Sequence, residues 1–263
     1  MRTVCVVLCL VFALPAAGAA PVNFENDVLP VLTRAGCNAG ACHGKARGQN
    51  GFQLSLLAFD PEFDYAALVK EARGRRVFPA APEQSLLLRK ATARMPHGGG
   101  KRLTPGDGMY EVLLEWVRQG VPRTTPNAPA LRRVTVEPTE VLLAYHAEQP
   151  LKVTAHYSDG STRDVTKLAT YQSNESAYAA VDENGVIKAG PLPGEAAVMS
   201  RYMNHFAVTQ VIIPFPGEVD PKVYQSWPRD HFIDRLVAQK WEQLRLTPSD
   251  VADDATFLRR AHL

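Results

Sequence analysis

The sequence has almost no excess of charge of either sign. Its 29 lysine and arginine residues are nearly balanced by 27 aspartate and glutamate residues, which leaves a formal net charge of +2. Dedicated nucleic-acid binding needs a concentrated basic face, so this balance argues against a nucleic-acid partner. Short basic clusters, such as Arg73, Arg75 and Arg76, are expected to lie on the solvated surface.

Long apolar runs and cysteines are scarce as well. The apolar run at residues 4–14 is shorter than the roughly 20 residues that a membrane-spanning helix requires. It follows a basic residue and precedes the small-residue site AGA at 17–19, a pattern typical of a cleaved secretory signal peptide over residues 1–20. Cleavage would remove Cys5 and Cys9, two of the four cysteines, and release the protein without a membrane span to the periplasm or cell surface.

Proline-rich stretches divide the remaining chain into three segments. Residues 21–121 show helical spacing of apolar residues, and residues 122–130 read as a stiff proline-rich linker. Residues 131–214 alternate between apolar and polar, with turn signals between the runs, and residues 215–263 return to helical spacing. We therefore predict an all-α domain, then an all-β sandwich, then a short α-helical stub that begins a longer, truncated domain.

Several elements can be placed within these segments. Asn23 is expected to cap a first helix that Pro30 bends or shortens, and Gly120 to end a closing helix at residues 110–119. Further helices are expected at residues 63–71, from Ser226 and Pro228 to Leu244, and at residues 256–263. Strands are expected at residues 134–136, 151–155, 186–187, 196–198 and 208–213.

The stretch GCNAGACHG at residues 36–44 carries the most specific chemical signal. A c-type haem is held by thioether bonds from two cysteines, and the histidine directly after the second cysteine binds the iron. Here four residues separate the cysteines instead of the usual two, and two extra small residues can be looped out. The motif predicts one covalent haem c on Cys37 and Cys42, with His43 as the proximal axial ligand.

Two other interpretations of the motif compete with haem. A disulfide between Cys37 and Cys42 suits an oxidising compartment but leaves His43 unexplained. A zinc site needs four ligands, and the mature chain offers no second cysteine pair to complete one.

A sixth iron ligand is expected downstream, in the stretch MPHGGG at residues 95–100. A methionine thioether at Met95 would give a His/Met site with a raised potential, although a single methionine more often fills a gap in a core. His97 is the second candidate, and an open coordination position is the third.

Residues 21–121 resemble the cytochrome c domains of secreted planctomycete-type proteins. The resemblance rests on FENDVLPVL at 24–32, the cysteine motif, MPHGG at 95–99 and EWVRQGVP at 115–122. It implies an all-α cytochrome c-like fold, with haem on the two cysteines and His43 and Met95 as axial ligands.

The other two segments resemble further domains of the same kind of protein. YSDGSTRDVT at 157–166 and AVDENGVIKA at 180–189 resemble hairpins of a bacterial Ig-like domain of group 2, which implies a spacer or adhesive module at the cell surface. FIDRL at 232–236 and FLRRAHL at 257–263 resemble the start of a planctomycete-type domain of unknown function.

These features predict an exported haem protein that transfers single electrons to a redox partner that the sequence does not identify. The Ig-like module is expected to act as a spacer or to contact the cell surface or a polysaccharide. An electron carrier needs no catalytic residue, and none is assigned. Two alternatives stay open: a surface or carbohydrate-associated protein with a Cys37–Cys42 disulfide and no haem, and the electron relay of an enzyme whose catalytic part lies outside this chain.

Overall fold

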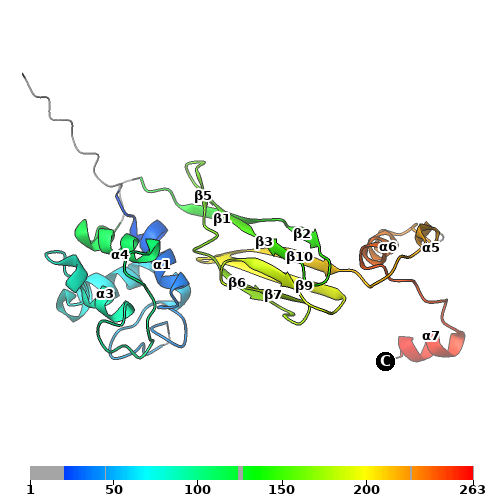
Figure 1. Cartoon of the computed structure of the whole chain (residues 1–263), viewed down its shortest axis with the longest axis horizontal. Coiled ribbons are helices and arrows are strands. Elements are labelled where there is room, and N and C mark those ends of the chain that lie inside the picture. The colour runs from blue at the N-terminus through cyan, green and yellow to red at the C-terminus, as the bar shows by residue number, and fades with distance from the viewer. Residues whose placement is uncertain (1–20, 45, 124–126, 226, 263) are drawn as a thin grey trace, which may run out of the picture.

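The computed structural model describes residues 21–44, 46–123, 127–225 and 227–262. A helical part, a group of β-sheets and a set of C-terminal helices follow one another along the long axis (Figure 1). The chain thus contains both helices and sheets, and two separate hydrophobic cores lie in its first two parts. Within the described ranges, the helices are too short or too polar to cross a membrane. The signal-like residues 1–20 lie outside these ranges.

The first part consists of short helices joined by loops. Its elements are η1 (Phe24–Val28), α1 (Leu29–Arg34), η2 (Leu56–Ala58), α2 (Pro61–Tyr65), η3 (Ala66–Lys70), η4 (Glu71–Gly74), η5 (Pro82–Gln84), α3 (Leu86–Ala91) and α4 (Gly108–Arg118). The side chain of Asn23 accepts the backbone N–H of Asn26 at 2.8 Å and so caps η1, as predicted. Pro30 lies in the first turn of α1, where its missing N–H breaks no helical hydrogen bond.

The core of this part forms where η1 and α1 pack against α4. Phe24 and Trp116 are both fully buried, and their ring centroids lie 5.5 Å apart. The indole N–H of Trp116 donates to the carbonyl of Pro122 at 2.7 Å, which ties the end of the segment back to its core. Gly120 has a φ of +83°, so it ends the closing helix in the left-handed conformation that glycine adopts readily.

The second part, the sandwich, is built from ten strands in three small sheets that share one hydrophobic core. The strands are β1 (Leu131–Glu137), β2 (Glu140–Leu142), β3 (Glu148–Pro150), β4 (Lys152–Tyr157), β5 (Thr162–Asp164), β6 (Thr170–Ser173), β7 (Ala179–Val181), β8 (Val186–Ala189), β9 (Gly194–Tyr202) and β10 (His205–Ile213). Their orders are β1-β4-β5, β2-β10-β9-β6 and β3-β8-β7. All pairs are antiparallel except β2 with β10, which is parallel. Every strand predicted from alternation falls on one of these elements.

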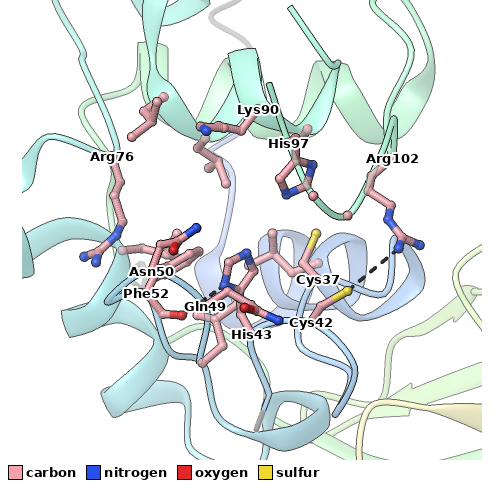
Figure 2. Close-up of a pocket in the computed structure, with 18 of the residues that line it drawn as sticks. Cys37, Cys42, His43, Gln49, Asn50, Phe52, Arg76, Lys90, His97 and Arg102 are labelled. Carbon is pink, nitrogen blue, oxygen red and sulfur yellow. Dashed lines mark hydrogen bonds between the residues drawn. The ribbon is translucent and has the colours of Figure 1, made fainter. Parts of the chain in front are cut away.

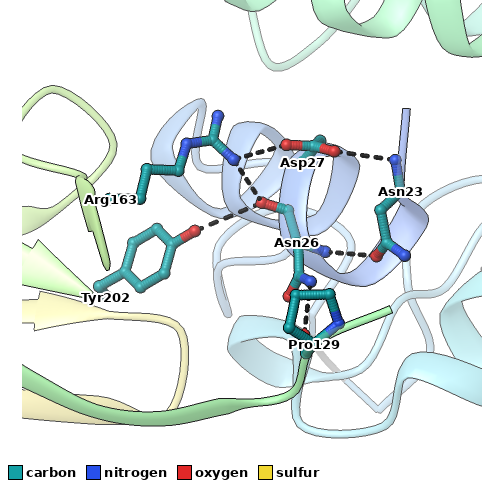
Figure 3. A network of polar contacts seen from close by, with 6 residues as sticks. All are labelled: Asn23, Asn26, Asp27, Pro129, Arg163 and Tyr202. Atoms are coloured by element: carbon teal, nitrogen blue, oxygen red, sulfur yellow. Dashed lines mark hydrogen bonds and ion pairs between the residues drawn. The ribbon is translucent and has the colours of Figure 1, made fainter. Parts of the chain in front are cut away.

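A polar network joins the first part to the sandwich (Figure 3). Arg163 of β5 donates to the carboxylate of Asp27 at 2.6 Å and to the carbonyl of Asn26 at 3.3 Å. The Tyr202 hydroxyl donates to the same carbonyl at 3.4 Å, and the side-chain amide of Asn26 donates to the carbonyl of Pro129 at 2.8 Å. The first turn of η1 is therefore held by side chains of the sandwich.

A second set of contacts supports this joint from α1. Arg34 donates to the carbonyls of Lys167 at 3.2 Å and Glu183 at 2.7 Å, in loops of the sandwich. Leu168 and Met203 pack against both hydrophobic cores. The first part and the sandwich are therefore joined by polar and apolar contacts in addition to the linker between them.

The C-terminal helices are α5 (Pro221–Gln225), α6 (Phe232–Leu244) and α7 (Asp254–Ala261). The helix expected to start near Pro228 begins at Phe232, because the ring of His231 accepts the N–H of Ile233 and caps α6 there. The other residue expected to start it, Ser226, lies outside the described ranges. Lys240 of α6 pairs with Glu195 of β9 at 2.6 Å, so α6 contacts the end of the sandwich.

Candidate functional site

The cysteine motif forms a tight loop that is tied to the end of α1. Gly36 has a φ of +73°, which turns the chain away from the helix. The N–H of Cys37 donates to the carbonyl of Leu32 at 2.9 Å, and the N–H of His43 donates to the carbonyl of Cys37 at 3.0 Å. These bonds fix the two ends of the loop relative to each other and to α1.

The four residues between the two cysteines differ in exposure. Gly40 and Ala41 are exposed, whereas Asn38 at the base is fully buried and donates from its side chain to the hydroxyl of Thr33 at 2.9 Å. With this four-residue spacing, Cys37, Cys42 and His43 are each partly buried.

A cavity of about 510 Å³ lies inside the loop, and Cys37, Cys42 and His43 all line it (Figure 2). This volume falls in the range of roughly 300–1,000 Å³ that is usual for small-molecule and cofactor pockets. Much of the remaining wall is apolar and comes from α1, η3, α3 and the loops between them. These apolar lining residues include Leu32, Phe52, Leu54, Leu68, Leu87 and Ala91. The structure thus brings the three residues of the motif together on one cavity.

The His43 imidazole is held by the loop that follows it. Its Nδ1 lies 2.9 Å from the carbonyl oxygen of Phe52, and the rings of the two residues lie 4.5 Å apart. A carbonyl only accepts, so Nδ1 carries the proton in the neutral ring and Nε2 carries the lone pair. Ligating histidines commonly have this second bond to a backbone carbonyl, which fixes the ring and its tautomer.

His97 lies across the cavity from His43 (Figure 2). The ring centroids of the two histidines are 6.4 Å apart, and their planes differ by 11°. Met95 is not among the residues that line the cavity; its N–H donates to the carbonyl of Arg89 at 3.1 Å. Of the two sixth-ligand candidates from the sequence, the structure therefore places His97 on the cavity.

The sulfur atoms of Cys37 and Cys42 are not joined in this structure. Burial raises the pKa of the Cys37 thiol to about 11, against the opposing effect of the Arg102 guanidinium. Cys37 is therefore a protonated thiol at neutral pH, unlike the low-pKa thiolates of catalytic cysteines. Arg102 also donates to the sulfur of Cys42 at 3.7 Å.

The charged part of the cavity wall is entirely cationic. Arg75, Arg76, Lys90 and Arg102 line it, and no aspartate or glutamate is found among its described lining residues. The pattern of apolar walls with several cations favours a ligand that is largely apolar and carries anionic groups at its edge.

The expectation that the cluster around Arg76 lies on the solvated surface is wrong for Arg76 itself. This residue is 5% exposed, donates to the carbonyls of Ala67 at 2.5 Å and Gly51 at 2.8 Å, and lies 4.5 Å from the ring centroid of Phe52. Burial lowers the pKa of its guanidinium. No sequence pattern marks Arg76, Lys90 and Arg102 as lining residues of this cavity, and Gly51 and Cys42, the partners of Arg76 and Arg102, are distant in the chain.

In the described ranges, no group of three or more histidine, cysteine, aspartate or glutamate side chains is arranged to hold a bare metal ion.

Gly44 provides a test of how tightly the loop is built. A Cβ at this position would lie 2.0 Å from the carbonyl oxygen of Asn38, so the backbone would have to move. We expect Gly44→Ala to destabilise the first part by about 1–3 kcal/mol, as overpacking of a tight site usually does. The measurement is chemical denaturation, followed by tryptophan fluorescence. Gly108→Ala is the matched control, because its Cβ would meet no atom within 4 Å and alanine favours α4; equal destabilisation by the two substitutions would contradict the expectation.

No model of a protein family matches the chain, and no curated protein matches it either. Several solved structures do. Domains 4 and 5 of the S-layer protein SbsC match with 19% identity and a TM-score of 0.29, over 33% of this chain and 53% of that chain. A GH10 xylanase from termite gut that contains a bacterial Ig-like domain matches with 17% identity and a TM-score of 0.21, over 36% and 23%. The adhesin InvE from Yersinia pseudotuberculosis matches with 13% identity and a TM-score of 0.19, over 33% and 27%. This chain covers about half of the SbsC fragment and smaller shares of the other two.

Proposed function

We propose that this chain is an exported c-type haem protein that transfers single electrons, with a cytochrome c-like first domain and an Ig-like module that places it at the cell surface. The proposal rests on one observation above all. Cys37 and Cys42, as separate thiols, and the imidazole of His43 line the same cavity. Only a c-type haem accounts for two cysteines and an adjacent histidine together.

The chemistry of the side chains that line the cavity fits a c-type haem. Cys37 and Cys42 would supply the two thioether sulfurs, and Nε2 of His43 would bind the iron because its Nδ1 is engaged by Phe52. When bound, a c-type haem supplies an iron centre that gains and loses one electron. The apolar wall would exclude water from it, and cations that line the cavity would pair with its carboxylates.

The test is spectroscopic and uses the exported protein purified from a host that matures c-type cytochromes. We expect a reduced c-type absorption spectrum and one haem per chain that stays with the protein after acid–acetone extraction. A second sample, with Gly40 and Ala41 deleted, restores the usual two-residue spacing between the cysteines and controls for a host that cannot mature the longer motif.

Two outcomes decide between the candidate functions. Haem that is retained on the wild-type chain supports the proposal, whereas haem on the deletion sample alone shows only that the host matures the usual motif. Colourless protein from both samples, without free thiols, would overturn it in favour of the surface protein closed by a Cys37–Cys42 disulfide.

The placement at the cell surface has its own support and its own test. The motifs YSDGSTRDVT and AVDENGVIKA, which resemble bacterial Ig-like sequences, form the β4–β5 and β7–β8 hairpins. In this proposal, the Ig-like module is a spacer between the first domain and the cell surface. Protease treatment of intact cells should remove the protein if it is exposed at the surface, and should leave it untouched if it is periplasmic.

A further inference from the structure

We propose that His97, and not Met95, is the second axial ligand, so that the cavity holds its haem between two histidines. This inference rests on the haem function proposed above and names the ligand set of that same site. It is based on two observations. The imidazoles of His43 and His97 face each other across one cavity, and Cys37 and Cys42 line the same cavity (Figure 2).

The separation of the two rings fits a metal between them. Metal–imidazole nitrogen bonds are about 2 Å long, so a metal bound by two opposed imidazoles separates the nitrogens by about 4 Å and the ring centres by about 6 Å. The centroids of His43 and His97 are 6.4 Å apart, and their planes are within 11° of parallel. The separation of the two rings therefore leaves room for one iron between them.

The two rings are also held in the same way. Nδ1 of His97 lies 2.8 Å from the carbonyl oxygen of Gly100, as Nδ1 of His43 lies 2.9 Å from that of Phe52. In both residues a carbonyl acceptor places the proton on Nδ1 and the lone pair on Nε2. Two neutral imidazoles that carry their lone pairs on Nε2 are the form in which histidines bind iron.

The loop that carries His97 is anchored so that this residue, and not Met95, lines the cavity. Lys90 of α3 donates to the carbonyl of Pro96 at 2.6 Å, and the N–H of Met95 donates to the carbonyl of Arg89. Gly99 lies beside the imidazole: a Cβ there would come within 3.0 Å of the His97 ring. The contacts with α3 hold the start of the loop, while the missing side chain at Gly99 leaves room for the ring.

A pair of single variants of the haem-loaded full chain tests the assignment. His97→Ala should turn the ferric haem from low spin to high spin in electron paramagnetic resonance, and should let the ferrous haem bind carbon monoxide. Added imidazole should restore the low-spin signal. Met95→Leu, an apolar substitution two residues away, should change neither the signal nor the midpoint potential. His97→Met should raise the midpoint potential, because a methionine ligand raises it relative to histidine.

The outcomes separate this inference from the function on which it rests. A haem protein whose spin state ignores His97→Ala, or whose haem becomes high spin in Met95→Leu, would overturn the assignment of His97 and leave the haem function intact. A wild-type protein that carries no haem would overturn the function itself.

Discussion

Replacement of both Cys37 and Cys42 by alanine is expected to abolish covalent attachment of haem while the chain still folds. In the wild type, two thioether bonds would keep the haem on the protein after denaturation, whereas in the double variant only coordination by histidine would remain. Coordination is lost when the protein unfolds. Mass spectrometry of the denatured chain should therefore show the mass of one haem on the wild type and none on the double variant.

Alanine is the right replacement because Cys37 packs against the apolar core of the first part. Serine would place a hydroxyl there with no assured hydrogen-bond partner, which would lower the stability of the fold for a reason unrelated to haem. Single variants refine the result: Cys42→Ala should leave at most one thioether bond, which still retains haem on a denaturing gel. Equal masses for the wild type and the double variant would contradict covalent attachment.

The same double variant also tests the competing hypothesis of a disulfide between Cys37 and Cys42. If the two thiols formed a disulfide, the wild type would carry no haem mass and no free thiol. Loss of so small a closed loop would then cost about 2 kcal/mol of stability. Denaturation of the wild type with and without reductant would reveal that contribution.

The sequence predicts much of this molecule where the deciding contacts are local. Asn23 caps its helix and Gly120 ends the last helix of the first part, because both effects depend on a few neighbouring residues. The strands of the sandwich follow from alternation over short runs. The motif at Cys37, Cys42 and His43 is contiguous, so its residues share one loop in the structure.

The sequence does not decide which of two residues on one loop reaches the cavity. Met95 and His97 lie on the same short loop, and which of them reaches the cavity depends on the bond from Lys90 to Pro96 and on the bond from His97 to Gly100. Neither contact leaves a periodic pattern in the chain.

Charged side chains show the same limit. Arg76 lies in a cluster that resembles a solvated surface, yet its partners Gly51 and Phe52 are far enough along the chain that no local pattern marks them. Arg163 and Asp27 pair across the joint between the first part and the sandwich, over 136 positions of sequence. Such pairs are chosen by the packing of whole segments.

The second large effect is expected from Trp116→Ala in α4. Trp116 is fully buried against Phe24, and removal of a buried tryptophan usually costs about 3–5 kcal/mol. The carbonyl of Pro122 would also lose its indole donor. For a domain of this size, that loss corresponds to a fall of roughly 15–25 °C in the melting temperature of the first part, measurable by calorimetry.

Which of the two thermal transitions is lowered tests whether the two hydrophobic cores unfold independently. Trp116 belongs to the core of the first part, and Ile187, fully buried in β8, belongs to the core of the sandwich. Ile187→Val should cost about 0.5–1.5 kcal/mol and lower only the transition of the sandwich. Trp116→Phe keeps an aromatic ring but no N–H donor, so it should cost less than alanine. If Trp116→Ala lowered both transitions equally, the joint formed by Arg163 and its neighbours would couple the two cores into one cooperative unit, because the linker alone could not transmit the loss.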